Sequence, residues 1–592
     1  MKHADAPIGD YGLLGDTRTA ALVSSDGAID WLCVPRFDGD PVFGRLVGGP
    51  EAGTFRVGPA TPSPVVGRRY RADSATLETT WAAGPGRLTL SEAMVAEVTG
   101  RLLPATLLVR RLSVVGGDVE AVVHFDPRLG ERHRRPRVRR GRGLVCEWGT
   151  LAVCLDSDPE LDIEPGTPVS ITITPGRPVT FMLAVASREP LVHVDPARAW
   201  DLVTGDEARW QAWAAQIDDR VPFRDAVVRS LLTLRLLTYS PSGAPVAAPS
   251  TSLPELPGGV RNWDYRYAWP RDASIGISAF LGVGKHDQAR AFLWWLLHAS
   301  RLERPRLPTM LTLTGGHVPR ERELTGWPGY AQSVPVRTGN DAATQHQLDG
   351  YGWVLDAAWA LVQAEHRLYP ETWRALRGFA DLVARRWQAP DAGIWEIRDD
   401  AAHHVHSKLM GWLALDRALC IGDTNRLPAR QRQRWLTARA AIAGTVRANG
   451  FDPVRGSYTR NFGSPDLDAA LLILPTLGLE APGSPALRGT IDAIGRELSA
   501  GGPLLYRYPP GRDGLSGTEG AFLPCSFWLV QALADTGRRP EAVALFENLL
   551  ELATPLGLYA EEMDPATHAH LGNFPQALTH AALIQAALAL RE

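Results

Sequence analysis

The sequence contains almost no lysine, few cysteines and no long hydrophobic run. Lysine occupies only positions 2, 285 and 408 among 62 basic residues, which 65 acidic residues offset to a formal net charge of −3. A chain so close to neutral lacks the strongly basic surface that binds nucleic acid or an anionic membrane, so neither is an expected partner. No stretch reaches 18 consecutive apolar residues, which excludes an ordinary membrane-spanning helix.

The five cysteines also exclude two common roles. They stand at positions 33, 146, 154, 420 and 525, an odd number without any C-x-x-C pair. Neither a disulfide framework nor a zinc site is therefore expected. The N-terminal segment carries Asp5 and Asp10 and has no apolar core of the kind found in secretory signals. These features together predict a cytoplasmic protein with free thiols.

What the sequence does contain falls into two parts. A chain of 592 residues is too long for one ordinary core, so at least two domains are expected. Residues 1–190 hold short β-branched or alternating runs separated by Gly, Pro and Asp, which predict an antiparallel β-sandwich. The clearest runs are 76–81, 87–94, 105–115, 119–125 and 178–186. The basic run 131–142 is interpreted as a solvated hairpin, because no aromatic residues interleave with its arginines.

Beyond residue 190 the pattern becomes helical. Residues 191–223 are predicted to form a helical linker, and apolar residues recur at helical spacing from 224 to 592. Twelve helices in six hairpins are the number found in an (α/α)6 barrel, so the expected fold class is multidomain β + α. The predicted helices span 224–240, 272–282, 286–299, 341–366, 371–387, 408–420, 427–448, 465–475, 485–499, 524–536, 539–552 and 575–590.

Long loops between these helices hold most of the unusual residues. The sequence has 19 tryptophans, several of them in polar loops where they could stack on the flat faces of sugars, although a core position is the common alternative. In RNWDYRYAWPRDAS (261–274), the adjacent Arg271 and Asp272 could donate to and accept from neighbouring hydroxyls of one sugar. The alternative is that Asp272 only caps the following helix.

A second loop, 391–412, offers a candidate proton donor. Glu396 follows Trp395, and an aromatic wall of this kind would help to keep the carboxyl group protonated. His403, His404 and His406 lie in the same loop. No carboxylate pattern accompanies them, so a metal site is not predicted.

Two further loops complete the candidate site. Arg507 in the loop 506–522 is a candidate donor to a sugar hydroxyl, and Glu561, Glu562 and Asp564 cluster in the loop 556–580. An acidic cluster before a helix is most often solubilising charge. If it faces Glu396, the pair would instead support glycosidic hydrolysis, with one carboxyl as the acid and the other as the base that activates water.

Several blocks resemble glycoside hydrolase family 15, which includes glucoamylases, glucodextranases and bacterial trehalases. IGDYGLLGDTRTAALVSSDGAIDWLCVPRFDGDPVFGRLVG (8–48) is similar to the start of the bacterial trehalase-like branch, in which a β-sandwich precedes the barrel. AAPSTSLPELPGGVRNWDYRYAWPRDAS (247–274) is the most specific match. The resemblance spans essentially the whole chain and implies an inverting α-glucoside hydrolase that needs no cofactor.

The resemblance implies roles for the residues of the first two loops. AWPRD is similar to the family motif W-x-R-D, which implies that Trp269, Arg271 and Asp272 bind the sugar in subsite −1. GIWE is similar to the segment that holds the general acid, which implies this role for Glu396. Trp395 beside it is expected to contact the substrate as well.

The remaining loops are assigned in the same way. AEEMD is similar to the S-E-Q-Y-D segment of fungal glucoamylases, which implies that Glu561, rather than Glu562, is the general base. RYP at 507–509 implies that Arg507 contacts a sugar hydroxyl. QLDGYG (347–352) also resembles a family block, and within it Asp349 is the residue expected to bear on activity.

Two departures from fungal glucoamylases concern the leaving half of the substrate. Ile397 stands where those enzymes have a second Glu, and NFPQALTHAAL (573–583) lacks a tryptophan found near their last helix. Both favour a small disaccharide, with α,α-trehalose preferred over isomaltose or other gluco-oligosaccharides. An inverting phosphorylase and a non-catalytic sugar sensor are the alternatives from other classes. The oligomeric state is left open, a homo-oligomer included.

Overall fold

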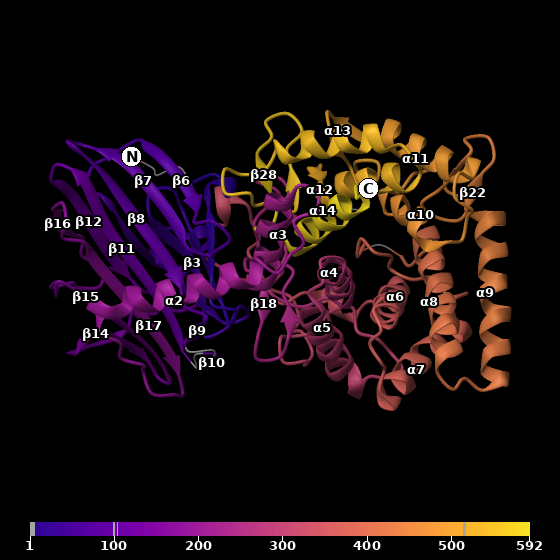
Figure 1. The fold of residues 1–592 in the computed structure, drawn as a ribbon, viewed down its shortest axis with the longest axis horizontal. Coiled ribbons are helices and arrows are strands. Elements are labelled where there is room, and N and C mark those ends of the chain that lie inside the picture. Colours follow the sequence, from indigo (N-terminus) through magenta and orange to yellow (C-terminus); the bar gives the residue numbers. More distant parts are fainter. Residues whose placement is uncertain (1–5, 99–100, 103–104, 399, 513–516, 592) are drawn as a thin grey trace.

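The protein has two domains that lie side by side. The computed structural model describes residues 6–98, 101–102, 105–398, 400–512 and 517–591. A strand-rich domain, indigo to purple, is followed by a helical domain, magenta to yellow (Figure 1). This confirms the predicted fold class, a β-sandwich followed by a helical barrel. Residues 399 and 513–516, which fall within two of the predicted loops, lie outside the described residues.

Two antiparallel sheets form the sandwich, and several strands alternate buried and exposed side chains, as expected when one face packs on a core. The first sheet has the order β1 (Gly12–Gly15), β2 (Ala20–Val23), β3 (Ala28–Val34), β5 (Thr54–Pro59), β12 (Val119–Asp126) and β16 (Val169–Ile173), and β4 (Asp40–Phe43) pairs with β3. The second has the order β13 (Arg137–Gly141), β14 (Gly143–Trp148), β15 (Leu151–Asp158), β17 (Val179–Ser187), β11 (Thr106–Gly116), β8 (Gly86–Met94), β7 (Leu77–Ala83) and β6 (Val65–Tyr70). The basic run supplies the exposed edge strand β13, which forms a hairpin with β14 as predicted.

A buried arginine connects the two sheets. Arg110 on β11 and Glu92 on β8 are both fully buried, with Nη2 and Oε1 2.6 Å apart. The same guanidinium donates to the backbone carbonyls of Phe55 and Gly27, which belong to the opposite side of the sandwich. Arg110 therefore donates to a buried carboxylate and to two buried carbonyls at once. Loss of this side chain would leave these acceptors without their arginine donor.

Helix α2 (Pro196–Ala214) packs on the second sheet and leads to α3 (Arg224–Leu236), the first helix of the barrel. The side chain of Asp195 caps α2 by accepting from the backbone N–H of Ala197. All five cysteines are free. Among the described residues, no helix combines the length and the apolar character that a membrane span requires.

The barrel consists of an inner and an outer ring. The inner ring is α4 (Pro270–Gly282), α6 (Asp349–Gln363), α8 (Val405–Thr424), η6 with α10 (Ala469–Ile473 and Leu474–Leu477), α12 (Leu523–Asp535) and α14 (Ala577–Ala589). Successive members contact one another, and α14 returns to contact α4, so the ring closes. The outer ring is α3, α5 (His286–Ala299), α7 (Pro370–Arg386), α9 (Ala429–Asn449), α11 (Pro485–Glu497) and α13 (Arg539–Leu550). Each of the twelve predicted helices has a counterpart.

Two predicted helices differ from the structure. The helix expected at 341–366 begins only at Asp349, because Asn340 caps a separate 3-10 turn and the backbone is extended at Gln345. The helix expected at 465–475 is mostly the 3-10 helix η6, followed by the single turn α10. Pro475 explains this difference, since it has no N–H to donate and its ring disfavours the α-helical register with the carbonyl four residues earlier.

The sandwich supports the loop that precedes α4. Trp31 on β3 donates its indole N–H to the carbonyl of Pro249 at 2.8 Å. From the barrel side, the buried Arg266 donates to the carbonyl of Gly39 at 3.0 Å and forms two short hydrogen bonds with Asp264. Buried contacts with both domains therefore fix the backbone on either side of Tyr265, a residue of the candidate site described below.

We predict that Glu92→Gln destabilises the sandwich by about 3 kcal/mol or more, because it leaves the buried Arg110 guanidinium without its counter-charge. Urea unfolding of the full-length chain, followed by tryptophan fluorescence, measures the shift of the sandwich transition. The exposed pair Arg432–Asp423 on the barrel provides a control, since Asp423→Asn should change stability by less than about 1 kcal/mol. Equal urea midpoints of unfolding for wild type and Glu92→Gln would show that the ion pair does not stabilise the sandwich.

Candidate active site

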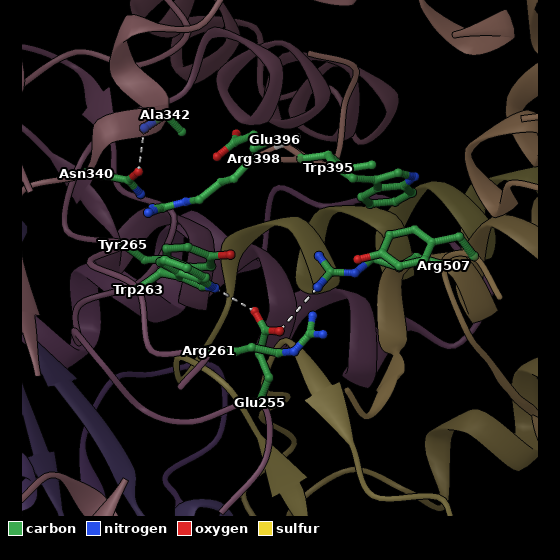
Figure 2. Close-up of a pocket in the computed structure, with 12 residues that line it drawn as sticks. Glu255, Arg261, Trp263, Tyr265, Asn340, Ala342, Trp395, Glu396, Arg398 and Arg507 are labelled. Atoms are coloured by element: carbon green, nitrogen blue, oxygen red, sulfur yellow. Dashed lines mark hydrogen bonds and ion pairs between the residues drawn. The ribbon is translucent and has the colours of Figure 1, made fainter. Parts of the chain in front are cut away.

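The predicted site residues lie on loops that precede inner-ring helices. Trp269 and Arg271 stand at the start of α4, Glu396 lies before α8, Arg507 before α12 and Glu561 before α14. Loops that each lead into an inner helix meet at one end of the ring. The four loops named from the sequence therefore contribute to a single pocket, part of which Figure 2 shows.

The pocket has two adjoining chambers, with volumes of about 420 and 510 Å³. Both volumes include space that is open to solvent. Tyr265, Trp395, Glu396 and Arg507 line both chambers and thus mark the boundary between them. The inner chamber is completed by Ala247, Trp269, Arg271, Asp272, Ile394, Phe522, Glu561, Gln576 and Leu578. The outer chamber is completed by Glu255, Arg261, Trp263, Asn340, Ala342, Ile397, Arg398 and Tyr508.

Glu396 lies at the tip of its loop in a strained backbone conformation. Its φ of 57° is in the left-handed region, which residues other than Gly and Asn rarely adopt. Trp269 donates its indole N–H to Oε1 of Glu396 at 2.7 Å, and Nη1 of Arg271 lies 3.6 Å from the same oxygen. Burial raises the pKa of Glu396, against the opposing effects of Arg271 and Trp269. This direction suits a group that must hold a proton until it donates it.

Glu561 is almost completely buried and is held by one oxygen only. Tyr265 donates its hydroxyl to Oε1 at 2.7 Å, whereas Oε2 has no hydrogen-bond partner among the described residues. A β-carbon at Gly572 would lie 2.8 Å from this buried Oε2, so a larger residue at position 572 would press on the carboxyl group. Burial, and next the negative charge of Glu255, raise the pKa of Glu561 to about 8.

The two carboxyl groups are connected through a pair of aromatic rings. Tyr265, which holds Glu561, and Trp269, which holds Glu396, pack edge to face with ring centroids 5.5 Å apart. Both glutamates line the inner chamber. Two residues that are 165 positions apart in the chain therefore reach the same cavity (561 − 396).

Arg271 and Asp272 form the closed end of the inner chamber. The guanidinium Nε of Arg271 donates to Oδ1 of Asp272 at 2.8 Å, and Nη1 donates to the carbonyl of Ile394 at 2.9 Å. The residue that caps α4 is Trp269, and Asp272 lies within the first turn without a capping hydrogen bond. The alternative of a simple helix cap is therefore wrong for Asp272.

Asp349 does not reach the substrate pocket. It is fully buried in the first turn of α6 and is not among the residues that line either chamber, so the structure does not place it against a bound sugar. Burial raises its pKa to about 7, while the nearby positive charge of Arg271 lowers it. Asp349 therefore interacts electrostatically with Arg271 and with Glu396 from outside the two chambers.

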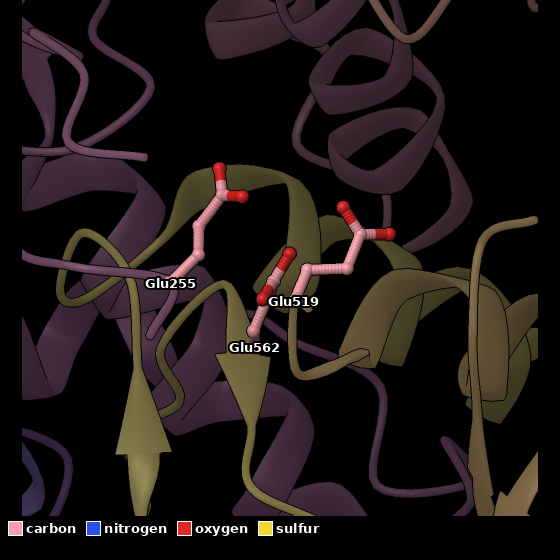
Figure 3. A group of neighbouring side chains, drawn as sticks. All are labelled: Glu255, Glu519 and Glu562. Atoms are coloured by element: carbon pink, nitrogen blue, oxygen red, sulfur yellow. The ribbon is translucent and has the colours of Figure 1, made fainter. Parts of the chain in front are cut away.

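Arg507 lies among carboxylates rather than pointing freely at the pocket. Its Nη2 is 2.7 Å from Glu519, 3.3 Å from Glu255 and 3.5 Å from Glu562. Figure 3 shows these three glutamates, which come from separate segments and whose oxygens lie within 4.8 Å of one another. Three carboxylates are enough to bind a metal ion, but the guanidinium of Arg507 already lies among them and supplies a positive charge.

The other loop residues have mainly structural contacts. Trp395 lines both chambers and donates its indole N–H to Asp468 at 2.8 Å, which fixes the ring plane. His403 stacks on Phe462, and His406 is completely buried beneath the site. These contacts give the histidines packing roles in the loop that carries Glu396.

Sequence reasoning missed several residues of the pocket. Tyr265 lies in the candidate site loop 261–274, and its place in this aromatic-rich segment could have indicated a role in the pocket. Glu255 lies in the block 247–274 and Arg398 stands two residues after Glu396, so the sequence singled out both segments without marking these two side chains as pocket residues. Asn340 lies outside the site loops named from the sequence.

Known proteins match the chain over nearly its full length. Residues 221–588 match glycosyl hydrolases family 15, and residues 2–173 match the trehalase-like N-terminal domain. The chain is 37% identical to a trehalase of Mycolicibacterium smegmatis, with 99% of this chain and 91% of the relative covered. It is 30% identical to a trehalase of Thermoplasma volcanium, with 100% and 96% covered. A bacterial glucoamylase complexed with acarbose shares the fold, with a TM-score of 0.72 and 13% identity over 99% of this chain and 94% of the other.

These matches establish the class of enzyme. The chain belongs to glycoside hydrolase family 15 and is a glycoside hydrolase. A carbohydrate substrate agrees with the polar, tryptophan-lined chambers described above.

We predict opposite shifts of the pH profile for two variants near Glu561. The base must be ionised, so kcat/KM for an α-glucoside should fall as the pH drops through a pKa near 8. Glu255→Gln removes a like charge and lowers that pKa, which moves the acidic limb to lower pH. Tyr265→Phe removes a hydrogen bond to the ionised form and moves the limb to higher pH.

We would measure kcat/KM between about pH 5 and pH 10 and compare the pH at which the acidic limb of the profile falls, rather than the absolute rates. Asp564→Asn serves as a control, because Asp564 lies in the same loop as Glu561 but lines neither chamber. Unchanged limbs in both pocket variants would show that another group controls the acidic side of the profile.

Proposed function

We propose that the enzyme hydrolyses α,α-trehalose with inversion at one anomeric carbon. The trehalases of Mycolicibacterium smegmatis and Thermoplasma volcanium match nearly the entire chain, which supports this substrate. The chemistry is supported by one observation above all. Glu396 and Glu561 line the same inner chamber, and each is held by its own aromatic donor.

One glucose of the disaccharide occupies the inner chamber and the other the outer chamber. Glu396, protonated, donates its proton to the glycosidic oxygen as the bond from that oxygen to C1 of the inner glucose breaks. Glu561, ionised, accepts a proton from a water molecule that attacks C1 from the opposite face. The inner glucose leaves as the β-anomer, as in inverting glycosidases generally.

The remaining inner-chamber residues orient the reacting sugar. Arg271 and Asp272 provide a fixed donor and acceptor at the closed end, where they bind hydroxyl groups of the inner glucose. Asp349 acts as a positioning residue beneath Arg271. We also propose a cytoplasmic location, which the five free cysteines support.

A phosphorylase is the alternative that shares this fold class. In that reaction phosphate replaces water and no carboxylate base is needed. Glu561, which lines the inner chamber and is oriented by Tyr265, favours hydrolysis instead.

We predict that trehalose initially yields α- and β-glucose in equal amounts. The inner glucose is inverted to the β-anomer, while the outer glucose retains its α-configuration because its own C1–O bond is not broken. Proton NMR of the first few per cent of reaction, before mutarotation, measures the ratio. The same assay with added inorganic phosphate should form no glucose-1-phosphate. Two α-glucose molecules per trehalose would indicate retention.

We predict that Glu396→Gln and Glu561→Gln each reduce kcat by at least about 100-fold. The amide retains the shape of the side chain but can neither donate the acid's proton nor accept one as a base. Circular dichroism and thermal unfolding establish that the variants are folded. Glu562→Gln, at the neighbouring position, tests the choice of base, since it should retain more activity than Glu561→Gln. The reverse order would transfer the base role to Glu562.

A further inference from the structure

The outer chamber presents a set of donors that the sequence did not reveal. At the position of the second Glu in fungal glucoamylases stands Ile397, whose side chain cannot form hydrogen bonds, and it lines this chamber. Recognition of the leaving sugar must therefore come from other residues. Figure 2 shows Asn340 and Arg398 close to Glu396 on one side of the chamber, and Glu255 on the opposite side.

Arg398 is held rigidly although it lies on a loop. Its Nη1 and Nη2 donate to the two oxygens of Glu321 at 3.0 and 2.5 Å, which is a bidentate pair. Its guanidinium also lies 4.2 Å from the ring centre of Trp263. A long side chain that is already fixed loses little conformational entropy on binding, so its remaining N–H groups can recognise a hydroxyl at low cost.

The same contacts fix the floor of the chamber. Glu321 also pairs with Arg337, whose guanidinium lies 4.6 Å from the ring of Trp263. Trp263 in turn donates its indole N–H to Glu255 at 3.0 Å. Glu321 thus binds both arginines, and both arginines contact the ring of Trp263. Trp263 orients the carboxylate of Glu255 in the pocket.

Asn340 offers a second donor with a defined orientation. Its Oδ1 accepts from the backbone N–H of Ala342 at 3.0 Å, so the amide nitrogen is the atom left to face elsewhere. Asn340 is almost completely buried and lines the outer chamber. An amide donor and a guanidinium donor therefore converge on this chamber from separate loops.

We propose that Arg398, preorganised by Glu321, is the specificity-determining residue for the leaving glucose, with Asn340 as its companion donor. This inference rests on the proposed function, because it names what occupies the outer chamber during the reaction. The hydroxyl groups of the leaving glucose accept hydrogen bonds from these two side chains. A leaving group without hydroxyls would gain nothing from either residue.

The test compares two substrates that share the inner glucose. Trehalose fills both chambers, whereas α-glucosyl fluoride places only fluoride at the leaving position. Arg398→Ala should lower kcat/KM for trehalose by about 10- to 100-fold, the effect of losing a charged hydrogen bond. It should change kcat/KM for α-glucosyl fluoride by less than about threefold. Arg398→Lys should recover only part of the loss, because an ammonium group lacks the bidentate geometry.

Two further variants separate the outcomes. Arg432→Ala, at a similarly exposed arginine on α9, should leave both substrates unaffected. Glu321→Gln should reproduce the selective loss on trehalose in weaker form, since it loosens Arg398 without removing it. Equal losses on both substrates for Arg398→Ala would mean that the residue positions Glu396 instead, and no loss on either would exclude any role in recognition.

Failure of the proposed function is distinguishable from failure of this inference. If the wild-type enzyme hydrolyses α-glucosyl fluoride but not trehalose, the substrate assignment is wrong. The loss of kcat/KM caused by Arg398→Ala is then compared between α-glucosyl fluoride and the disaccharide that is cleaved, maltose or isomaltose. A selective loss on that disaccharide would still support Arg398, and a uniform loss would overturn it.

Discussion

The edge-to-face contact between Tyr265 and Trp269 is the constraint on which the active site depends. Each ring holds one of the two proposed catalytic carboxyl groups by a 2.7 Å hydrogen bond, so the spacing of the two rings sets the relative position of Glu396 and Glu561. Both residues belong to a single loop, and buried contacts with the β-sandwich fix that loop through Arg266. The N-terminal domain is thus connected to the chemistry through a few short hydrogen bonds, which gives a physical reason for its place ahead of the barrel.

Electrostatics divides the pocket into two halves of different character. Around Glu561, burial raises the pKa most, and the negative charges of Glu255 and Glu519 raise it further, against the opposing effect of Arg507. Around Glu396, Arg271 and the indole of Trp269 oppose the effect of burial. The cost of the buried negative charge is offset where Arg507 contacts several carboxylates at once.

Much of this arrangement could be predicted from the sequence. Helical periodicity located all twelve barrel helices, and it failed only where Pro475 and the turn at Asn340 interrupt the α-helical register. The four site loops were identifiable because Trp, Arg and carboxylates cluster in them. The roles of Arg398 and Glu255 were not identifiable, although both stand in segments that the sequence singled out, since only tertiary contacts show that their side chains line the pocket. The complete burial of Asp349 could not be predicted either, because helical periodicity indicates which face of a helix is buried but not how deeply a residue on it lies.

The geometry of acid and base is tested most directly by a crystal structure of the enzyme with a thio-linked, non-hydrolysable trehalose analogue. The account predicts one glucose ring in the inner chamber, the Glu396 carboxyl group beside the bridging sulfur, and Glu561 on the opposite face of the ring. The two carboxyl groups should then be about 6.5–9.5 Å apart, leaving space for a water molecule near C1. A separation of about 5 Å, or a Glu561 carboxyl group that faces away from the sugar, would contradict it.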